Sequence, residues 1–242
     1  MKYTLEICAN SIESALAAQK GGADRIELCD NMEEGGTTPS YGMIKTCKKH
    51  LTIPVFPIIR PRGGDFVYSD AEFEVMKADI EMAKSLNCEG VVLGVLHRDG
   101  TIDKSRCAEL IALARPMQVT FHRAFDCCSD LFAALEDIID LGCERVLTSG
   151  GQPTALEGAE VIAQLINKSR KRIRIMAGSG VTDLNLAPLA EKTGVAEVHS
   201  TAKVRLSADF VNNNSKVQTD IYQTSIEKVQ LLVKILKGPA IE

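Results

Sequence analysis

Short apolar segments alternate with longer amphipathic segments along most of this 242-residue chain, and that alternation restricts the possible folds more than any other feature. The apolar segments are rich in Val, Ile and Leu, as expected for parallel strands that are buried on both faces. We predict eight strands, at residues 4–8, 25–29, 55–60, 90–96, 118–122, 145–149, 172–177 and 197–200. Eight strands alternating with helices over about 250 residues predict an α/β fold of the (β/α)8 type, the TIM barrel. We therefore expect a single domain over residues 1–242, with a C-terminal helix at 220–236.

The main alternative is an open, doubly wound sheet. Such a sheet usually carries a glycine-rich nucleotide-binding motif after its first strand. Here the first turn reads Cys8-Ala9-Asn10-Ser11 and contains no glycine. The junctions near residues 22, 87, 142 and 194 also repeat one pattern, a Gly or Asn followed by a small apolar residue and then an acid. This repeat is typical of helices that end in a left-handed residue before the next strand, and it favours the barrel.

The composition argues against several classes of protein. Apolar residues make up 45% of the chain and charged residues 25%, with a net charge of −4, which is typical of globular proteins. A nucleic-acid-binding protein usually has a basic face, and a membrane helix needs about 20 consecutive apolar residues. We expect neither partner, and we expect no organic cofactor. The first residues lack the apolar core of a signal peptide, so we expect a cytoplasmic protein. Base rates for soluble proteins suggest a homodimer.

The eight cysteines are scattered and include no CxxC motif. In a reducing cytoplasm such cysteines are expected to be free thiols, and a closed zinc site is not expected. Cys127 and Cys128 are adjacent, and the sequence leaves open whether they bind metal, become oxidised or simply pack.

The sequence contains two similar segments that lie 21 residues apart. They are Leu5-Glu6-Ile7-Cys8 and Ile26-Glu27-Leu28-Cys29. Side chains two apart on a strand face the same way, and neighbouring strands lie about 4.8 Å apart. If these strands face inward, Glu6, Glu27, Cys8 and Cys29 share one mouth of the barrel. Two thiols suit a soft ion such as Cu(I), and two carboxylates suit acid–base catalysis. The alternatives are that the cysteines only pack and that a glutamate pairs with an arginine.

Glycine-containing turns follow the sixth and seventh predicted strands. They comprise Ser149, Gly150 and Gly151 in the first turn, and Gly178, Ser179 and Gly180 in the second. Successive backbone N–H groups in such turns bind anions, and many barrels hold a substrate phosphate near their last two strands. Any tight turn between a strand and a helix also favours glycine, so this pattern alone is not specific. A third loop, at residues 30–38, is long enough to close over the site.

Three further polar residues follow predicted strands. His122 is a candidate proton shuttle, and Asp126 lies close behind it. Arg60 is placed to hold a carboxylate or a phosphate with two hydrogen bonds, or else to neutralise Glu27. A histidine at a strand end, such as His122 or His199, also serves simply as a hydrogen-bonded core residue.

Several long motifs of this chain resemble the CutC family. The resemblance covers about residues 1–203 and rests on Leu5-Glu6-Ile7-Cys8-Ala9, Gly22-Ala23-Asp24-Arg25-Ile26-Glu27-Leu28-Cys29, Gly35-Gly36-Thr37-Thr38-Pro39-Ser40, Pro57-Ile58-Ile59-Arg60-Pro61-Arg62-Gly63-Gly64-Asp65-Phe66, Thr120-Phe121-His122-Arg123-Ala124-Phe125-Asp126 and Leu147-Thr148-Ser149-Gly150-Gly151. It implies a cytosolic TIM-barrel protein associated with copper homeostasis, with Cys8 and Cys29 as the copper-binding thiols.

Two functional hypotheses follow. The first is a copper-homeostasis protein that binds Cu(I) through Cys8 and Cys29. The second is an enzyme, of the isomerase or lyase type, that acts on a small anionic or phosphorylated metabolite. Its candidate catalytic residues are Glu6, Glu27, Arg60, His122 and Asp126, and its anion site is formed by the two glycine-containing turns.

Overall fold

Eight parallel strands form the centre of the computed structural model, which describes residues 3–206 and 221–238. The strands are β1 (Thr4–Ala9), β2 (Arg25–Leu28), β3 (Val55–Pro57), β4 (Gly90–Leu93), β5 (Gln118–Phe121), β6 (Arg145–Thr148), β7 (Arg174–Ala177) and β8 (Glu197–Ser200). They are hydrogen-bonded in the order β3-β2-β1-β8-β7-β6-β5-β4. A bridge between Ile58 and Val92 joins the two outer strands and closes the sheet into a barrel. The predicted TIM barrel is therefore confirmed.

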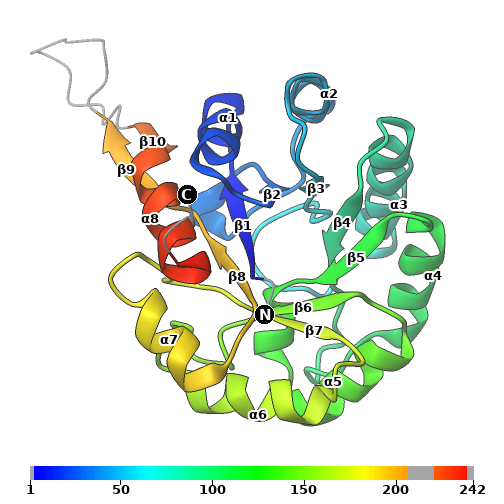
Figure 1. Cartoon of the computed structure of the whole chain (residues 1–242). Coiled ribbons are helices and arrows are strands. Elements are labelled where there is room, and N and C mark those ends of the chain that lie inside the picture. The colour runs from blue at the N-terminus through cyan, green and yellow to red at the C-terminus, as the bar shows by residue number, and fades with distance from the viewer. Residues whose placement is uncertain (1–2, 207–220, 239–242) are drawn as a thin grey trace, which may run out of the picture.

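Helices follow the strands and form a ring outside the barrel (Figure 1). They are α1 (Ile12–Gly21), α2 (Tyr41–His50), α3 (Asp70–Ser85), α4 (Lys104–Ala114), α5 (Leu131–Asp140), α6 (Ala159–Ser169), α7 (Leu186–Thr193) and α8 (Ile226–Lys237), with short 3-10 helices η1 (Met32–Glu34) and η2 (Arg123–Cys127). Local sequence sets many of these boundaries. Ser11 accepts a hydrogen bond from the N–H of Ser14 at the start of α1, and Gly22 ends that helix in the left-handed conformation, with φ of 96°.

The end of the chain differs from the sequence-based expectation. We expected a helix over residues 220–236, but Ile221–Thr224 form strand β10, which pairs antiparallel with β9 (Lys203–Leu206). Two β-branched residues, Ile221 and Thr224, and the aromatic Tyr222 favour a strand in this segment. Helix α8 begins only after Ser225, whose side chain accepts a hydrogen bond from the N–H of Lys228. Residue 220 lies outside the described residues. Figure 1 shows β9, β10 and α8 together at one edge of the barrel.

Charged side chains, rather than apolar ones alone, fill the amino-terminal part of the barrel. Glu197 accepts hydrogen bonds from Arg25 at 3.2 Å, from Arg145 at 3.1 Å and from Arg174 at 3.0 Å. Arg25 also pairs with Glu6, which is completely buried. Because buried charges are costly unless paired, the buried members Glu6, Arg25, Arg145 and Glu197 must come together as the barrel closes, whereas the Arg174 side chain is largely exposed. We call Glu6, Arg25, Arg145, Arg174 and Glu197 the barrel ion network.

An aromatic ring packs against this network. The Phe56 ring centre lies 5.1 Å from the guanidinium carbon of Arg25 and 5.3 Å from that of Arg145. Gly90 makes room for this ring, because a Cβ atom at that position would lie 2.3 Å from Phe56. Only glycine fits there without moving the ring and the two arginines stacked on it.

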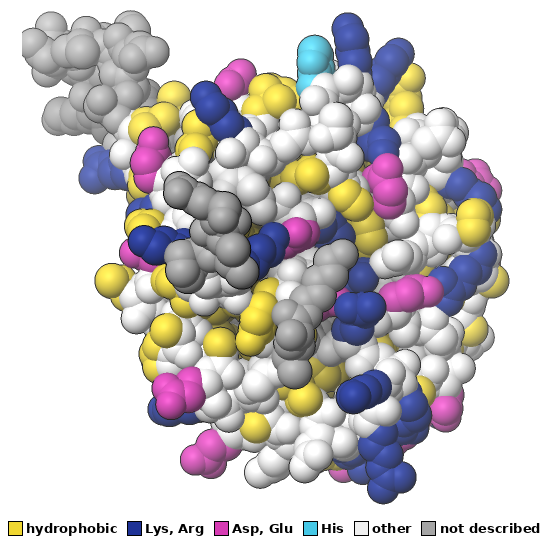
Figure 2. Space-filling model, in the orientation of Figure 1, with side chains coloured by type: hydrophobic (Ala, Val, Ile, Leu, Met, Phe, Trp, Pro, Cys, Tyr) yellow, Lys and Arg dark blue, Asp and Glu magenta, His cyan; other side chains and the backbone are white. Residues whose placement is uncertain are grey.

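The outer surface is mixed in character. On the face shown in Figure 2, acidic and basic side chains are interspersed with apolar ones. Among residues 3–206 and 221–238, no helix combines the length and the apolar character needed to cross a membrane.

The ion network gives a stability prediction. Glu197→Gln removes the negative charge that faces three arginines, so we expect the free energy of unfolding to fall by about 3–5 kcal/mol. Urea unfolding followed by circular dichroism measures this change. The matched control is Glu160→Gln on the exposed surface of α6, which we expect to change stability by less than about 0.5 kcal/mol. Equal stability of the two variants would refute the structural role of the network.

Candidate functional site

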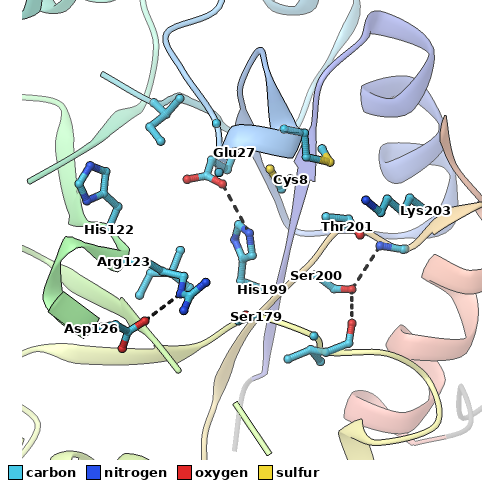
Figure 3. A pocket seen from close by; sticks show the side chains of 18 of the residues that line it. Cys8, Glu27, His122, Arg123, Asp126, Ser179, His199, Ser200, Thr201 and Lys203 are labelled. Carbon is cyan, nitrogen blue, oxygen red and sulfur yellow. Dashed lines mark hydrogen bonds and ion pairs between the residues drawn. The ribbon is translucent and has the colours of Figure 1, made fainter. Parts of the chain in front are cut away.

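A cavity of about 810 Å³ opens at the carboxyl ends of the strands. Its lining brings together Cys8 and Glu27 from β1 and β2, His122 from the end of β5, and His199 from β8. Figure 3 shows these side chains around the same space. Arg60, Asp126, Gly151, Ser179 and Gly180 also line it. Many of the residues singled out in the sequence therefore come from distant segments to one end of the barrel, whereas Glu6, Cys29, Ser149, Gly150 and Gly178 do not line the cavity.

Two buried thiols lie in contact beside the cavity. The Sγ atoms of Cys8 and Cys29 are 3.4 Å apart, and the two residues are 7% and 1% exposed. Apolar side chains of Phe56, Ile58 and Val92 surround them. The hydrogen bond with Cys29, together with burial, raises the pKa of the Cys8 thiol well above its usual range. The Cys8 thiol is thus protonated at neutral pH, and a metal ion must displace its proton to bind.

A histidine and a carboxylate lie next to these thiols. The Nε2 atom of His199 is 3.5 Å from Oε2 of Glu27, and the ligand atoms of Cys8, Glu27 and His199 all lie within 4.8 Å of one another. The strand register explains the arrangement, because Cys8 on β1 pairs with Glu27 on β2. Burial raises the pKa of the Glu27 carboxyl. His199 entered the sequence analysis only as a strand-end histidine, and its contact with Glu27 depends on β8 lying beside β1.

Glu6 and Glu27 have different surroundings, although the sequence placed them at one mouth. Glu6 is completely buried and does not line the cavity. It pairs with Arg25 and accepts a hydrogen bond of 2.9 Å from Nδ1 of His199. Burial opposes its charge, but Arg25 and His199 outweigh burial and lower the pKa of Glu6 to about 2. Glu6 therefore orients His199 from behind and does not reach a ligand in the cavity.

The turn at Ser149, Gly150 and Gly151 already holds an anion, which is the carboxylate of Asp126. The N–H groups of Ser149 and Gly151 each donate to Asp126 at 3.0 Å, and the Ser149 hydroxyl donates at the same distance. Arg123 adds a hydrogen bond of 2.8 Å to Oδ2 of this carboxylate, the oxygen that also accepts from the Ser149 hydroxyl. Figure 3 shows the pairing of Arg123 with Asp126. These contacts assign Asp126 to anchoring the turn, and they occupy the donors that we expected to bind a substrate anion.

The second turn, at Gly178, Ser179 and Gly180, has no such occupant. Among the described residues, no hydrogen bond reaches the N–H groups of Ser179 and Gly180. Both residues are left-handed, with φ of 81° and 67°. The Gly178 N–H donates to the carbonyl of Thr148, which ties this turn to β6.

Arg60 binds backbone carbonyl groups instead of Glu27. One terminal nitrogen donates to the carbonyls of Glu34 and Gly36 at 2.8 Å, and the other donates to Gly64 at 2.7 Å. Arg60 therefore fixes the long loop after β2 at the edge of the cavity. Its Nε atom is buried and has no hydrogen-bond partner in the described structure.

His122 is held as a neutral ring. Its Nδ1 atom accepts a hydrogen bond of 3.2 Å from the N–H of Ala124, so its proton must lie on Nε2. Burial and the nearby positive charge of Arg60 lower the pKa of His122 to about 3. The Nε2 atom is buried without a partner among the described residues, and the Phe66 ring centre lies 4.9 Å from the imidazole. In this state His122 is a hydrogen-bond donor rather than a base.

The adjacent cysteines lie at the rim. Cys127 is exposed and lines the cavity, whereas the Cys128 Sγ donates to the carbonyl of Ala124 at 3.7 Å. The two thiols therefore have different surroundings.

Comparisons with known proteins agree with this fold. Residues 3–204 match the model of the CutC family. A human protein named copper homeostasis protein cutC homolog is 48% identical over 245 residues, which cover 98% of this chain and 90% of that protein. A crystal structure of CutC from Streptococcus agalactiae has a TM-score of 0.79 at 36% identity, over 82% of this chain and 98% of that one. Thiamine phosphate pyrophosphorylase from Pyrococcus furiosus shares the fold alone, with a TM-score of 0.61 at 15% identity over 97% of this chain and 96% of that one.

The neutral state of His122 predicts a pH-dependent stability. The pKa of His122 is about 3 in the folded chain, against an ordinary value of 6.5, so only the unfolded chain takes up a proton between these values. The contribution of neutral His122 to the free energy of unfolding is fully present above about pH 6.5 and is lost as the pH falls below that value. We expect a loss of about 2 kcal/mol by pH 5 relative to pH 7.5.

Urea unfolding at several pH values measures this loss. His122→Asn keeps an acceptor for the N–H of Ala124 but cannot be protonated, so it should lack this part of the pH dependence. Parallel stability curves for the two proteins would contradict the assigned state of His122.

Proposed function

The chain belongs to the CutC family, and from that premise we propose that it is a cytoplasmic copper-homeostasis protein that binds Cu(I) through Cys8 and Cys29. The names of its relatives support a role in copper homeostasis. The observation that carries the binding proposal is the pair of buried thiols, whose sulfur atoms lie 3.4 Å apart. Soft thiolate ligands select Cu(I), and the apolar side chains of Phe56, Ile58 and Val92 pack against the two thiols.

The distance between the two sulfur atoms indicates the geometry of binding. A metal–sulfur bond to a thiolate is about 2.3 Å long, so an ion held linearly would need sulfur atoms more than 4 Å apart. At the observed 3.4 Å, an ion bound to both sulfurs has a bent geometry that leaves room for a third ligand.

His199 is the best third ligand. Its Nε2 atom belongs to the group of ligand atoms that includes Cys8 and Glu27. Imidazole suits copper better than a carboxylate does, which favours His199 over Glu27. The hydrogen bond from Nδ1 to Glu6 fixes the ring with Nε2 directed at the site, as in many metal centres whose histidine ligand is held by a carboxylate.

Cu(I) titration tests the proposal. Under anaerobic conditions and in competition with a chromophoric Cu(I) chelator, the wild-type protein should bind one Cu(I) tightly. The double variant Cys8→Ser, Cys29→Ser should lose this binding, because hydroxyl groups are poor ligands for a soft ion. The matched control, Cys127→Ser with Cys128→Ser, keeps both buried thiols and should retain one Cu(I). Full binding by the first variant, or loss of binding in the second, would refute the proposal.

His199 gives a second prediction. His199→Asn should weaken Cu(I) binding by at least about tenfold without abolishing it, because both thiolates remain. The control His97→Asn changes an exposed histidine outside the cavity, and its Cu(I) affinity should equal that of the wild type. Equal affinities for all three proteins would exclude His199 as a ligand.

A further inference from the structure

The turn between β7 and α7 contains three consecutive residues whose backbone N–H groups are not used in the hydrogen bonds of the described structure. Within residues 3–206 and 221–238, no hydrogen bond reaches the N–H groups of Ser179, Gly180 or Val181. All three residues line the cavity. Successive N–H groups in such turns form concave sites for anions.

The neighbouring turn after β6 shares part of this backbone shape and holds a carboxylate, although the N–H of Gly178, unlike that of Ser149, is bonded to Thr148. Both turns contain two consecutive left-handed residues, Gly150 and Gly151 in one and Ser179 and Gly180 in the other, with φ between 67° and 81°. The first turn is filled by the carboxylate of Asp126. Among the described residues, no carboxylate accepts from the N–H groups of the second turn, so these donors remain available to an anion from outside the chain.

Two lysines stand on the same side of the cavity. The Ser200 hydroxyl donates to the carbonyl of Val181 at 2.7 Å and accepts from the N–H of Ala202, which holds the segments after β7 and β8 together. Lys203 follows directly, and the ammonium group of Lys228 donates to its carbonyl at 3.3 Å. Figure 3 shows Ser200 and Lys203 on one side of the space and His122 on the other, with Ser179 between them below His199.

The charges there favour an anion. Lys203 and Lys228 both line the cavity, and neither makes an ion pair within the described part of the chain. The ammonium of Lys203 lies 5.0 Å from the centre of the Tyr222 ring, a contact that leaves its N–H donors available. Asp183 also lines this region and opposes an anion, so the two lysines leave one net positive charge beside the turn.

We propose that the N–H groups of Ser179, Gly180 and Val181, together with Lys203 and Lys228, bind the phosphate group of a small metabolite. A tetrahedral phosphate offers three oxygens to three N–H groups and two ammonium groups, whereas a planar carboxylate offers only two. The cavity of about 810 Å³ has room for a metabolite attached to this phosphate. The attached group extends towards Glu27, His199 and Cys8, which line the other part of the same space. The copper thiols and a phosphorylated ligand thus share one cavity.

Binding of inorganic phosphate provides the first test. Phosphorus NMR line broadening and calorimetry, at constant ionic strength, should show one phosphate bound per chain. Acetate should bind at least about tenfold more weakly. Absence of saturable phosphate binding would overturn the proposal.

A matched pair of variants tests whether phosphate binds at the turn that contains Ser179. Ser179→Asp adds a negative charge beside the donors, and Ser179→Asn has the same shape without the charge; Asp and Asn both tolerate the left-handed conformation. Phosphate affinity should fall at least about tenfold in Ser179→Asp and stay within about threefold of wild type in Ser179→Asn. Equal affinity in the two variants would show that phosphate binds elsewhere.

A lysine variant keeps the test decisive if a change at Ser179 impairs folding. Lys228→Met should weaken phosphate binding by about tenfold, the effect of losing one charge-assisted hydrogen bond. Lys192→Met, at the far end of α7 and outside the cavity, should leave it unchanged. Lys228→Met should still bind one Cu(I), so failure of the phosphate site is distinguishable from failure of the copper site. Unchanged phosphate affinity in Lys228→Met would contradict the proposal.

Discussion

The buried carboxylate of Glu6 is the interaction on which the rest of the structure depends. One of its oxygens pairs with Arg25, which belongs to the ion network at the amino-terminal part of the barrel, and the other accepts from Nδ1 of His199. The group that neutralises a buried arginine thus also fixes the ring whose second nitrogen faces Glu27. The buried charges of Glu6 and Arg25 are costly unless they are paired, so closure of the barrel also positions His199 in the site. The site is preorganised by the core and not by a loop.

Some polar groups around the cavity already have hydrogen-bond partners within the chain, and others remain available to a ligand. Asp126 occupies the turn after β6, and Arg60 is largely used in holding loop carbonyls. The thiols of Cys8 and Cys29 contact each other and offer two soft ligands on the β1–β2 side of the cavity. The turn at Ser179 offers N–H donors on the other. This division favours a soft cation and an oxyanion as the two ligands of one cavity.

Much of this architecture is readable in the sequence, because burial on both faces gives each barrel strand its apolar pattern. Strand ends then place Cys8, Glu27 and His122 at one end of the barrel. The separate roles of Glu6 and Glu27 were not predictable, since they depend on the register that sets Cys8 beside Glu27. The occupation of the β6 turn by Asp126 depends on a long-range approach of η2. The ion network did leave a signal in the sequence, because β2, β6, β7 and β8 each begin with a charged residue, and buried strands rarely do.

The most direct test of the central claim is copper X-ray absorption spectroscopy on the anaerobic protein loaded with one equivalent of Cu(I). The proposed site predicts two sulfur neighbours and one lighter neighbour around copper, from Cys8, Cys29 and His199. The lighter neighbour should disappear or change in His199→Asn. A copper environment made only of nitrogen and oxygen neighbours, or one that is unchanged when both cysteines are replaced by serine, would contradict the account.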